Sequence, residues 1–152
     1  MSGQLSKISY ALDAALSTKL LATSTTLASR LSVANVAFDP NAEGDANAGA
    51  PWFRSTVMPG EPYQQSMGGA NFGVNTFPGI YQVDCFYPKG GGDSAALAMA
   101  DTLASYFKRG STFTSAGITI RVKRAWTNTP AEEDRWFHVP VVVSWWADVD
   151  NT

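Results

Sequence analysis

Residues 135–147 constrain the fold more than any other part of the sequence. An unbroken apolar set occupies alternate positions there: Phe137, Val139, Val141, Val143 and Trp145. Successive side chains of a strand point to opposite faces, so this alternation predicts a long strand with one face in the core. Pro140 has no N–H to donate, so we expect the strand to lie at a sheet edge or to be bulged there.

Two helices and three further strands are predicted around this strand. Residues 4 to about 20 form an amphipathic helix, because apolar residues recur every three or four positions along one stripe: Leu5, Ile8, Leu12 and Leu16. Residues 93–108 form a second helix, with Asp93 or Ser94 to cap its start and Gly110 to end it. Strands are expected at residues 52–58, 79–87 and 117–126. This order predicts an α+β fold, with a single antiparallel or mixed β-sheet and two helices packed on one face.

The remaining segments are expected to be irregular, and the whole chain, residues 1–152, is expected to form a single domain. Loops are predicted at residues 39–51, 60–77 and 127–134, and an extended segment at 33–38. The predicted core lies under the helix stripes and combines residues of three strands: Phe137, Val139, Val141, Val143, Tyr81, Val83, Cys85, Ile118, Ile120 and Val122.

Residues 63–77 contain three glycines and only a few apolar side chains, which include Met67 and Phe72. The segment reads either as an irregular loop or as a loose hairpin. A loop of this length in a compact domain is usually functional or disordered. We therefore expect it to be mobile in a free subunit and to become ordered against a neighbouring subunit.

The overall composition excludes several classes of protein. The chain is 45% hydrophobic but only 16% charged, which leaves more surface for contacts with other subunits, and its formal net charge of −2 gives no overall positive field. The sequence has no run of about 18 apolar residues, so no membrane-spanning helix is expected, and the first 12 residues lack the pattern of a secretory signal. The single cysteine, Cys85, excludes an internal disulfide and fits a reducing compartment.

The sequence offers little for catalysis. His138 is the only histidine, so a hydrolase would need to combine it with Cys85, and one Cys with one His does not make a zinc site. Lys89 precedes three glycines rather than following them, unlike a phosphate-binding loop. The adjacent acids 132–134 are typical of a solvated loop. We therefore expect no catalytic, cofactor or metal site, and no enzyme.

A basic segment within one predicted strand is the main candidate for a binding surface. Arg121 and Lys123 are expected on the solvent face of this strand, Arg124 on the opposite face, and Trp126 follows them. A nucleic-acid-binding module is one interpretation. A polar contact between subunits is the other, and the negative net charge of the chain favours it. Interfaces are rich in Trp and Arg, and the candidate interface residues are Arg54, Met67, Phe72, Arg121, Lys123, Trp126 and Trp136.

Three stretches together resemble one protein family. They are GIYQVDCFYPKGGGDSAALAMADTLASYF from residue 79, GITIRVKRAW from residue 117 and WFHVPVVVSWWAD from residue 136. Their order is similar to the second half of tail terminator proteins from long-tailed, non-contractile bacteriophages, and RSTVMPGEP from residue 54 resembles that family's first clear strand and turn. The likeness covers residues 5–147, and it is loose over 33–50.

The resemblance implies a structural protein that forms a six-membered ring, caps the finished tail tube, stops its polymerisation and presents a surface for head joining. The implied partners are further copies of the chain, the tail tube protein and a head-completion or connector protein, with DNA only as passing cargo. It implies no cofactor and no membrane, and a location at the head-proximal end of the virion tail after assembly in the host cytoplasm. A head–tail joining or neck subunit is the alternative in the same particle.

Overall fold

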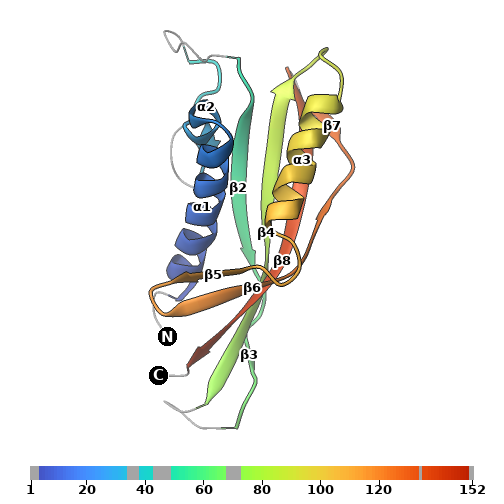
Figure 1. The fold of residues 1–152 in the computed structure, drawn as a ribbon. Coiled ribbons are helices and arrows are strands. Elements are labelled where there is room, and N and C mark those ends of the chain that lie inside the picture. The colour runs from blue at the N-terminus through green and yellow to red at the C-terminus, as the bar shows by residue number, and fades with distance from the viewer. Residues whose placement is uncertain (1–3, 34–37, 43–48, 68–72, 134, 151–152) are drawn as a thin grey trace.

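A computed structural model shows two main helices in front of one curled β-sheet (Figure 1). It describes residues 4–33, 38–42, 49–67, 73–133 and 135–150. The helices and strands are, in chain order, α1 (Gln4–Thr23), α2 (Thr25–Ala28), β1 (Leu31–Ser32), β2 (Trp52–Pro59), β3 (Tyr63–Gln64), β4 (Val74–Pro88), α3 (Ser94–Tyr106), β5 (Thr112–Ser115), β6 (Ile118–Thr127), β7 (Ala131–Glu133) and β8 (Trp136–Asp150).

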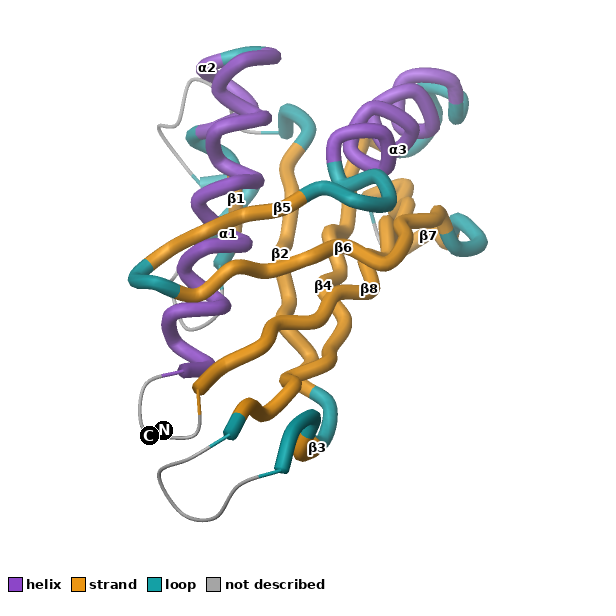
Figure 2. The backbone as a smooth tube through the Cα atoms, turned by 60° about the horizontal axis from the view of Figure 1, so that its bottom comes forward, coloured by secondary structure: helices purple, strands orange, loops and turns teal. Residues whose placement is uncertain are grey.

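The sheet is mixed and strongly curled. Its strand order is β1-β2-β4-β8-β6-β5, with β3 paired to β4 and β7 paired to β8. Only the β1–β2 pair is parallel among the described strand pairs. Figure 2 shows β5 and β6 turning across the molecule, so that β5 passes beside α1. The predicted α+β fold, with one sheet and its helices on one face, is confirmed.

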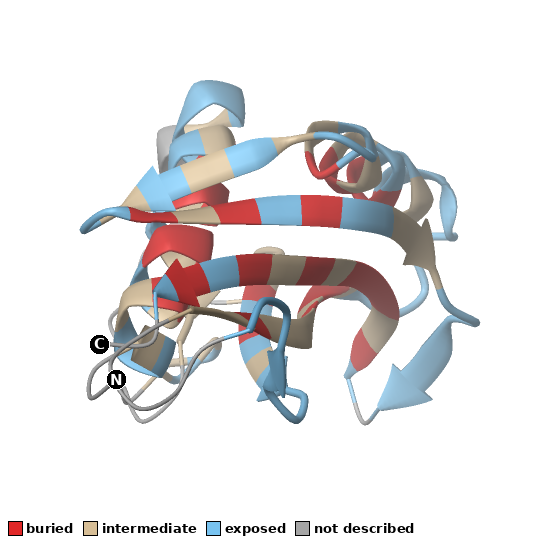
Figure 3. Cartoon of the chain, turned by 90° about the horizontal axis from the view of Figure 1, so that it is seen from below, coloured by how far each residue is buried: buried red, intermediate tan, exposed pale blue. Residues whose placement is uncertain are grey.

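The core lies between the helices and the sheet. The α1 stripe is buried from Ile8 to Leu20, whereas Leu5, which was expected on this stripe, is 46% exposed in the first turn. Red and pale segments alternate along the strands in Figure 3, as the period of two requires. Nine of the ten predicted sheet residues are buried, and Phe137 is half-buried, because it lines a hollow beside the glycine turn that precedes α3.

Val141 gives a test of this core, because it lies on the central strand β8 with no exposed area. We expect Val141→Ala to lower the free energy of unfolding by about 1–3 kcal/mol, since the deleted methyl groups leave a cavity. Denaturant unfolding measures the loss. Ser144→Ala, on the other face of the same strand, is the matched control. A loss for Val141→Ala no larger than that of the control would show that the core face is wrongly assigned.

One polar contact also ties α1 to the sheet. The Tyr81 hydroxyl donates a hydrogen bond of 2.7 Å to Oδ1 of Asp13. Burial, and then the neighbouring Asp13 carboxylate, raise the pKa of Tyr81 well above its usual value. The phenol therefore stays protonated and remains a donor at any ordinary pH.

The structure places strands within two of the predicted loops. Strand β4 begins at Val74 rather than at residue 79, and β3 pairs with it, so residues 60–77 include a hairpin, which was the second interpretation of this segment. The start of β4 is tied to β8, because the Thr76 hydroxyl donates to Asp148 at 2.6 Å. Strand β5 was not expected, and β7 lies within the predicted loop 127–134. Such short polar strands carry no alternation of apolar residues, so the sequence pattern did not reveal them.

Two other irregular segments were also predicted. The described residues of 39–51 contain no helix or strand, as expected. Most of the extended segment predicted at 33–38 lies outside the described residues.

The expectation about Pro140 is wrong in both of its forms. Strand β8 is central, between β4 and β6, and the only register shift recorded in the β6–β8 pair is in β6. The N and C=O of one residue point to the same side of a strand, and the Pro140 carbonyl accepts from Asn128 N–H at 3.0 Å. The missing donor thus faces the point where β6 ends at Thr127 and the chain leaves towards β7. Pro140 therefore lacks a donor only towards Asn128, one residue beyond the end of β6.

Candidate functional site

The candidate site lies on the sheet face that points away from α1 and α3, here called the outer face. Its β6 part is shaped by a bulge: Val122 pairs with Trp145, but Arg124 pairs with Ser144, so Lys123 is an extra residue. Side chains after the bulge therefore change face. Arg124 and Arg121 both lie on the outer face, which corrects the expectation that Arg124 has the opposite orientation.

Two of these arginines cover tryptophan rings. The guanidinium carbon of Arg121 lies 5.6 Å from the ring centre of Trp146 on β8, and that of Arg124 lies 4.9 Å from the ring centre of Trp126. Trp126 also donates its indole N–H to Oδ1 of Asn128 at 3.1 Å. Cation–π contacts of this kind hold a guanidinium plane in place. The two arginines are thus oriented before any partner binds.

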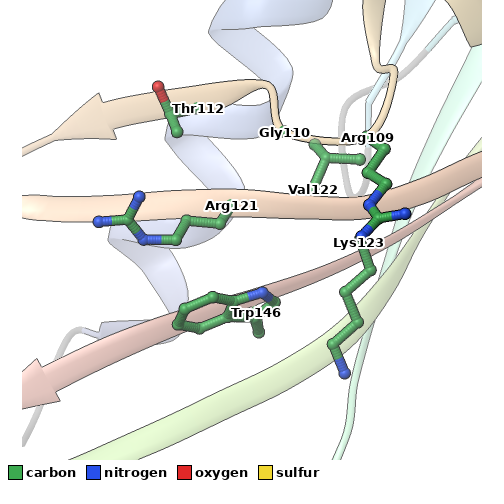
Figure 4. Close-up of a pocket in the computed structure, with 7 residues that line it drawn as sticks. All are labelled: Arg109, Gly110, Thr112, Arg121, Val122, Lys123 and Trp146. Atoms are coloured by element: carbon green, nitrogen blue, oxygen red, sulfur yellow. The ribbon is translucent and has the colours of Figure 1, made fainter.

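A hollow of about 420 Å³ lies beside these pairs, and Arg109, Thr112, Arg121, Lys123 and Trp146 contribute to its lining. Figure 4 shows Trp146 between the ends of the Arg121 and Lys123 side chains, with Arg109 entering from the turn after α3. We call Arg109, Arg121, Lys123 and Arg124, together with Trp126 and Trp146, the basic surface. Within the part of the chain that the structure describes, none of its four cations forms an ion pair.

A second group on the outer face surrounds Asp84, which is only 2% exposed. Its Oδ1 accepts from Gln82 and is 2.7 Å from Nε2 of His138. Its Oδ2 accepts from Nε of Arg54 at 3.2 Å and forms an ion pair with Nη2 at 3.1 Å. A buried carboxylate with several donors stabilises the sheet locally. Arg54 is therefore committed to a partner in its own chain, although 44% of its side chain is exposed.

Aromatic rings continue this group across β2, β4 and β8. Trp52 stacks on Phe86 with ring centres 4.0 Å apart, and Phe86 stacks on the His138 ring at 4.7 Å. Trp136 meets Trp52 edge-on at 5.9 Å and is 8% exposed. Trp136 thus has little area left for a partner, although it was predicted as an interface residue.

A third exposed feature is apolar and lies at the β3 end of the sheet. Met67 is 96% exposed, Tyr63 is 54% exposed and Met58 is 41% exposed. Phe72, the other apolar candidate from this segment, lies outside the described residues.

Of the seven interface candidates, the structure brings Arg121, Lys123 and Trp126 together, and it places Arg54 and Trp136 in the Asp84 group. Sequence reasoning missed Arg109 and Trp146. One signal was available, because residues 102–131 contain five of the eleven basic residues and none of the thirteen acidic ones. Assigning side chains to alternating strand faces does not reveal this cluster of basic residues.

The hydrolase hypothesis is contradicted by the geometry. Cys85 belongs to the buried core face, and burial raises the pKa of its thiol far above the ordinary value, which suppresses the nucleophilic thiolate. His138 lies on the outer face with Phe86, its cross-strand neighbour. The sheet therefore separates the two side chains.

Other chemical candidates also resolve into structural roles. Lys89 Nζ lies 3.5 Å from Oε2 of Glu132. Asp93 was expected as a possible cap of α3, but its side chain makes no capping bond. Among the described residues, no group of three His, Cys, Asp or Glu side chains could hold a metal ion. None of the described helices is long and apolar enough to cross a membrane.

Comparison with known proteins gives two findings. The sequence profile of a family described as "phage tail terminator protein" matches residues 7–145. A solved structure superposes with a TM-score of 0.72 over 95% of both chains at 23% identity, which supports the fold alone. No curated protein sequence matches this chain.

Proposed function

Because this chain belongs to the phage tail terminator protein family, we propose that it forms a ring, of six copies, that caps the finished tail tube. In this proposal the ring stops polymerisation of the tube and offers a surface to a head-completion or connector protein. Members of the family are structural components of the phage tail rather than enzymes. The family match over residues 7–145 is the observation that carries the proposal.

The exposed surfaces support a protein that works in contact with several partners. The basic surface holds oriented arginines next to tryptophan rings, and Trp and Arg are the residues most enriched at the energetic centres of interfaces. Met58, Tyr63 and Met67 add exposed apolar area at another part of the chain. We assign the basic surface to contacts between copies and the apolar β3 end to the tail tube protein.

Particles assembled without this protein provide the functional test. Tail tubes of uncontrolled length are expected in electron micrographs, because nothing would stop tube growth. Tails of normal length that lack heads would instead identify the chain as a neck subunit. Normal virions would contradict both functions.

The ring itself can be observed on the purified protein and on tube ends. Negative-stain images over a range of concentrations, together with native mass spectrometry, should show closed rings of six copies. The ring would be contradicted if the protein is found only as a monomer in solution and no ring-shaped density appears at the ends of tail tubes.

Arg121→Glu is expected to weaken association at least tenfold without unfolding the subunit. The side chain is exposed, so the fold tolerates the change, but the reversed charge repels the group that it meets in the ring. Sedimentation over a concentration series measures association, and thermal unfolding checks the fold. Lys108→Glu is the control, because it makes the same charge change on an exposed lysine that lines a different hollow. Equal effects of both variants would show that only net charge matters.

A further inference from the structure

We propose that the basic surface of one copy binds the acidic end of the next copy in the ring. The acidic end is defined by Asp93 at the start of α3 and by Glu132 and Glu133 on β7. The contact is heterologous, meaning that two different patches meet. This inference deepens the proposed ring and rests on it.

The first support is the segregation of charge along the chain. Since residues 102–131 hold five basic and no acidic side chains, the rest of the chain carries six basic and thirteen acidic side chains. Four of the five clustered cations make up the basic surface and have no ionic partner among the described residues. Repulsion between them is relieved if a partner supplies carboxylates.

The acidic end has the matching chemistry. Asp93, Glu132 and Glu133 are all exposed, and Asp93 and Glu132 line one hollow of about 300 Å³. Lys89 offsets one charge through its 3.5 Å contact with Glu132, and His138 Nδ1 lies 3.6 Å from Glu133. Carboxylate oxygens therefore remain available to guanidinium donors.

The two patches lie at opposite ends of α3. Figure 1 shows β7 beside the start of α3 and β6 beyond its other end, and Arg109 follows that end three residues after Tyr106. A helix of 13 residues spans about 20 Å, which is about twice the Debye length at physiological salt. Charges so far apart are screened from each other within one chain. They gain full strength only when one patch meets the other on a neighbouring copy.

Ring symmetry selects this pairing over a self-pairing. A closed ring is built from head-to-tail contacts between unlike patches, and a basic patch against itself costs several kcal/mol. Nucleic acid is the competing occupant. However, the faces of Trp146 and Trp126 are covered by Arg121 and Arg124, so they are not free to stack on bases. The observations thus favour carboxylates of a second copy.

A charge-reversal exchange tests the pairing. Variant A carries Arg121→Glu and Arg124→Glu, and variant B carries Glu132→Lys and Glu133→Lys. Each alone is expected to form rings only at concentrations at least tenfold above those of the wild type. An equimolar mixture is expected to recover rings of alternating A and B, since one contact is native and the other has both signs reversed. Native mass spectrometry reads the composition, and thermal unfolding checks the folding of each variant.

Cysteine crosslinking gives a second measurement that does not depend on reversed charges. The native thiol of Cys85 is fully buried, so an added surface cysteine is the only reactive one. Arg124→Cys and Glu132→Cys are mixed and treated with a short bismaleimide. Mixed dimers are expected, and neither variant alone should crosslink. Self-crosslinking of Arg124→Cys would overturn the heterologous contact.

The outcomes separate this inference from the ring. Wild-type rings together with a mixture that fails to recover would overturn the charge pairing and leave the ring intact. Absence of wild-type rings, both in solution and on tubes, would overturn the ring and the pairing with it. If variant A forms normal rings but loses salt-dependent binding to a short DNA duplex, the basic surface binds nucleic acid and the pairing is wrong.

Discussion

Replacement of Trp145 by alanine is expected to lower the free energy of unfolding by about 3–5 kcal/mol. Trp145 is 1% exposed and is the largest fully buried side chain among the described residues. It lies on the central strand β8, and its ring packs against the backbone of Gly79, its cross-strand neighbour on β4. Its removal leaves a cavity that a rigid sheet cannot close. Denaturant unfolding measures the loss, and the dependence of the free energy of unfolding on denaturant concentration should stay the same.

A double-mutant cycle with Gly79 makes this prediction specific. A Cβ at position 79 would overlap the indole ring of Trp145, so Gly79→Ala alone should also destabilise the fold. In the Trp145→Ala background the overlap with the ring is gone and only the Met58 carbonyl oxygen remains close, at 3.0 Å, so the cost of the added methyl group should fall by more than about 1 kcal/mol. Trp145→Phe is the conservative control with a smaller loss, because the indole N–H has no hydrogen-bond partner among the described residues. Additive losses would show that ring and glycine are not in contact.

Arg30→Met is expected to cost about 3 kcal/mol, although it keeps most of the side-chain length. Arg30 is 2% exposed, and its guanidinium donates to the carbonyls of Pro40, Ala50 and Pro51 at 2.9–3.0 Å. Hydrogen bonds from a charged donor contribute about 1.5–3 kcal/mol each, and water near these half-buried carbonyls recovers part of that loss. Thermal unfolding measures the effect.

Arg30→Lys separates hydrogen bonding from charge. A lysine ammonium is a single point donor and cannot reach three carbonyls as a planar guanidinium does, so its loss should approach that of Arg30→Met. Amide exchange at Phe53 should also accelerate in both variants, because its N–H donates to the Arg30 carbonyl. Full stability of Arg30→Lys would show that charge alone is required.

These stability effects differ from those expected on the basic surface. Trp145 and Arg30 are buried, whereas Arg121 and Lys123 are exposed, so substitution of Arg121 or Lys123 is expected to change association without changing the fold. A variant that unfolds and a variant that fails to form rings can therefore be told apart by one thermal scan.

The main strands and helices could be predicted from local pattern. A sheet with one face in the core needs apolar residues at every second position, and a helix on that sheet needs them every three or four. Strand β8, most of β4 and the α1 stripe from Ile8 satisfy these conditions, and all were located correctly. The short strands β3, β5 and β7 have no such pattern. They are held in place by pairing with a longer strand, not by an apolar face of their own.

The candidate site was predicted less completely. Arg121, Lys123 and Trp126 were found because they share one strand, but Arg109 comes from a turn and Trp146 from a different strand. Arg124 was assigned to the wrong face, because the extra residue at the bulge reverses the alternation of faces in the part of β6 that follows it. A bulge depends on the register of the partner strand, and the residues of β6 alone do not define it.

The sequence by itself determined the fold class and the buried faces of β4 and β8, because these depend on residue type and local period. Only the tertiary structure decided the central place of β8, the separation of Cys85 from His138 and the gathering of separate cations into one surface. These features depend on strand order and register. Contacts between distant segments set both, and no local period encodes such contacts.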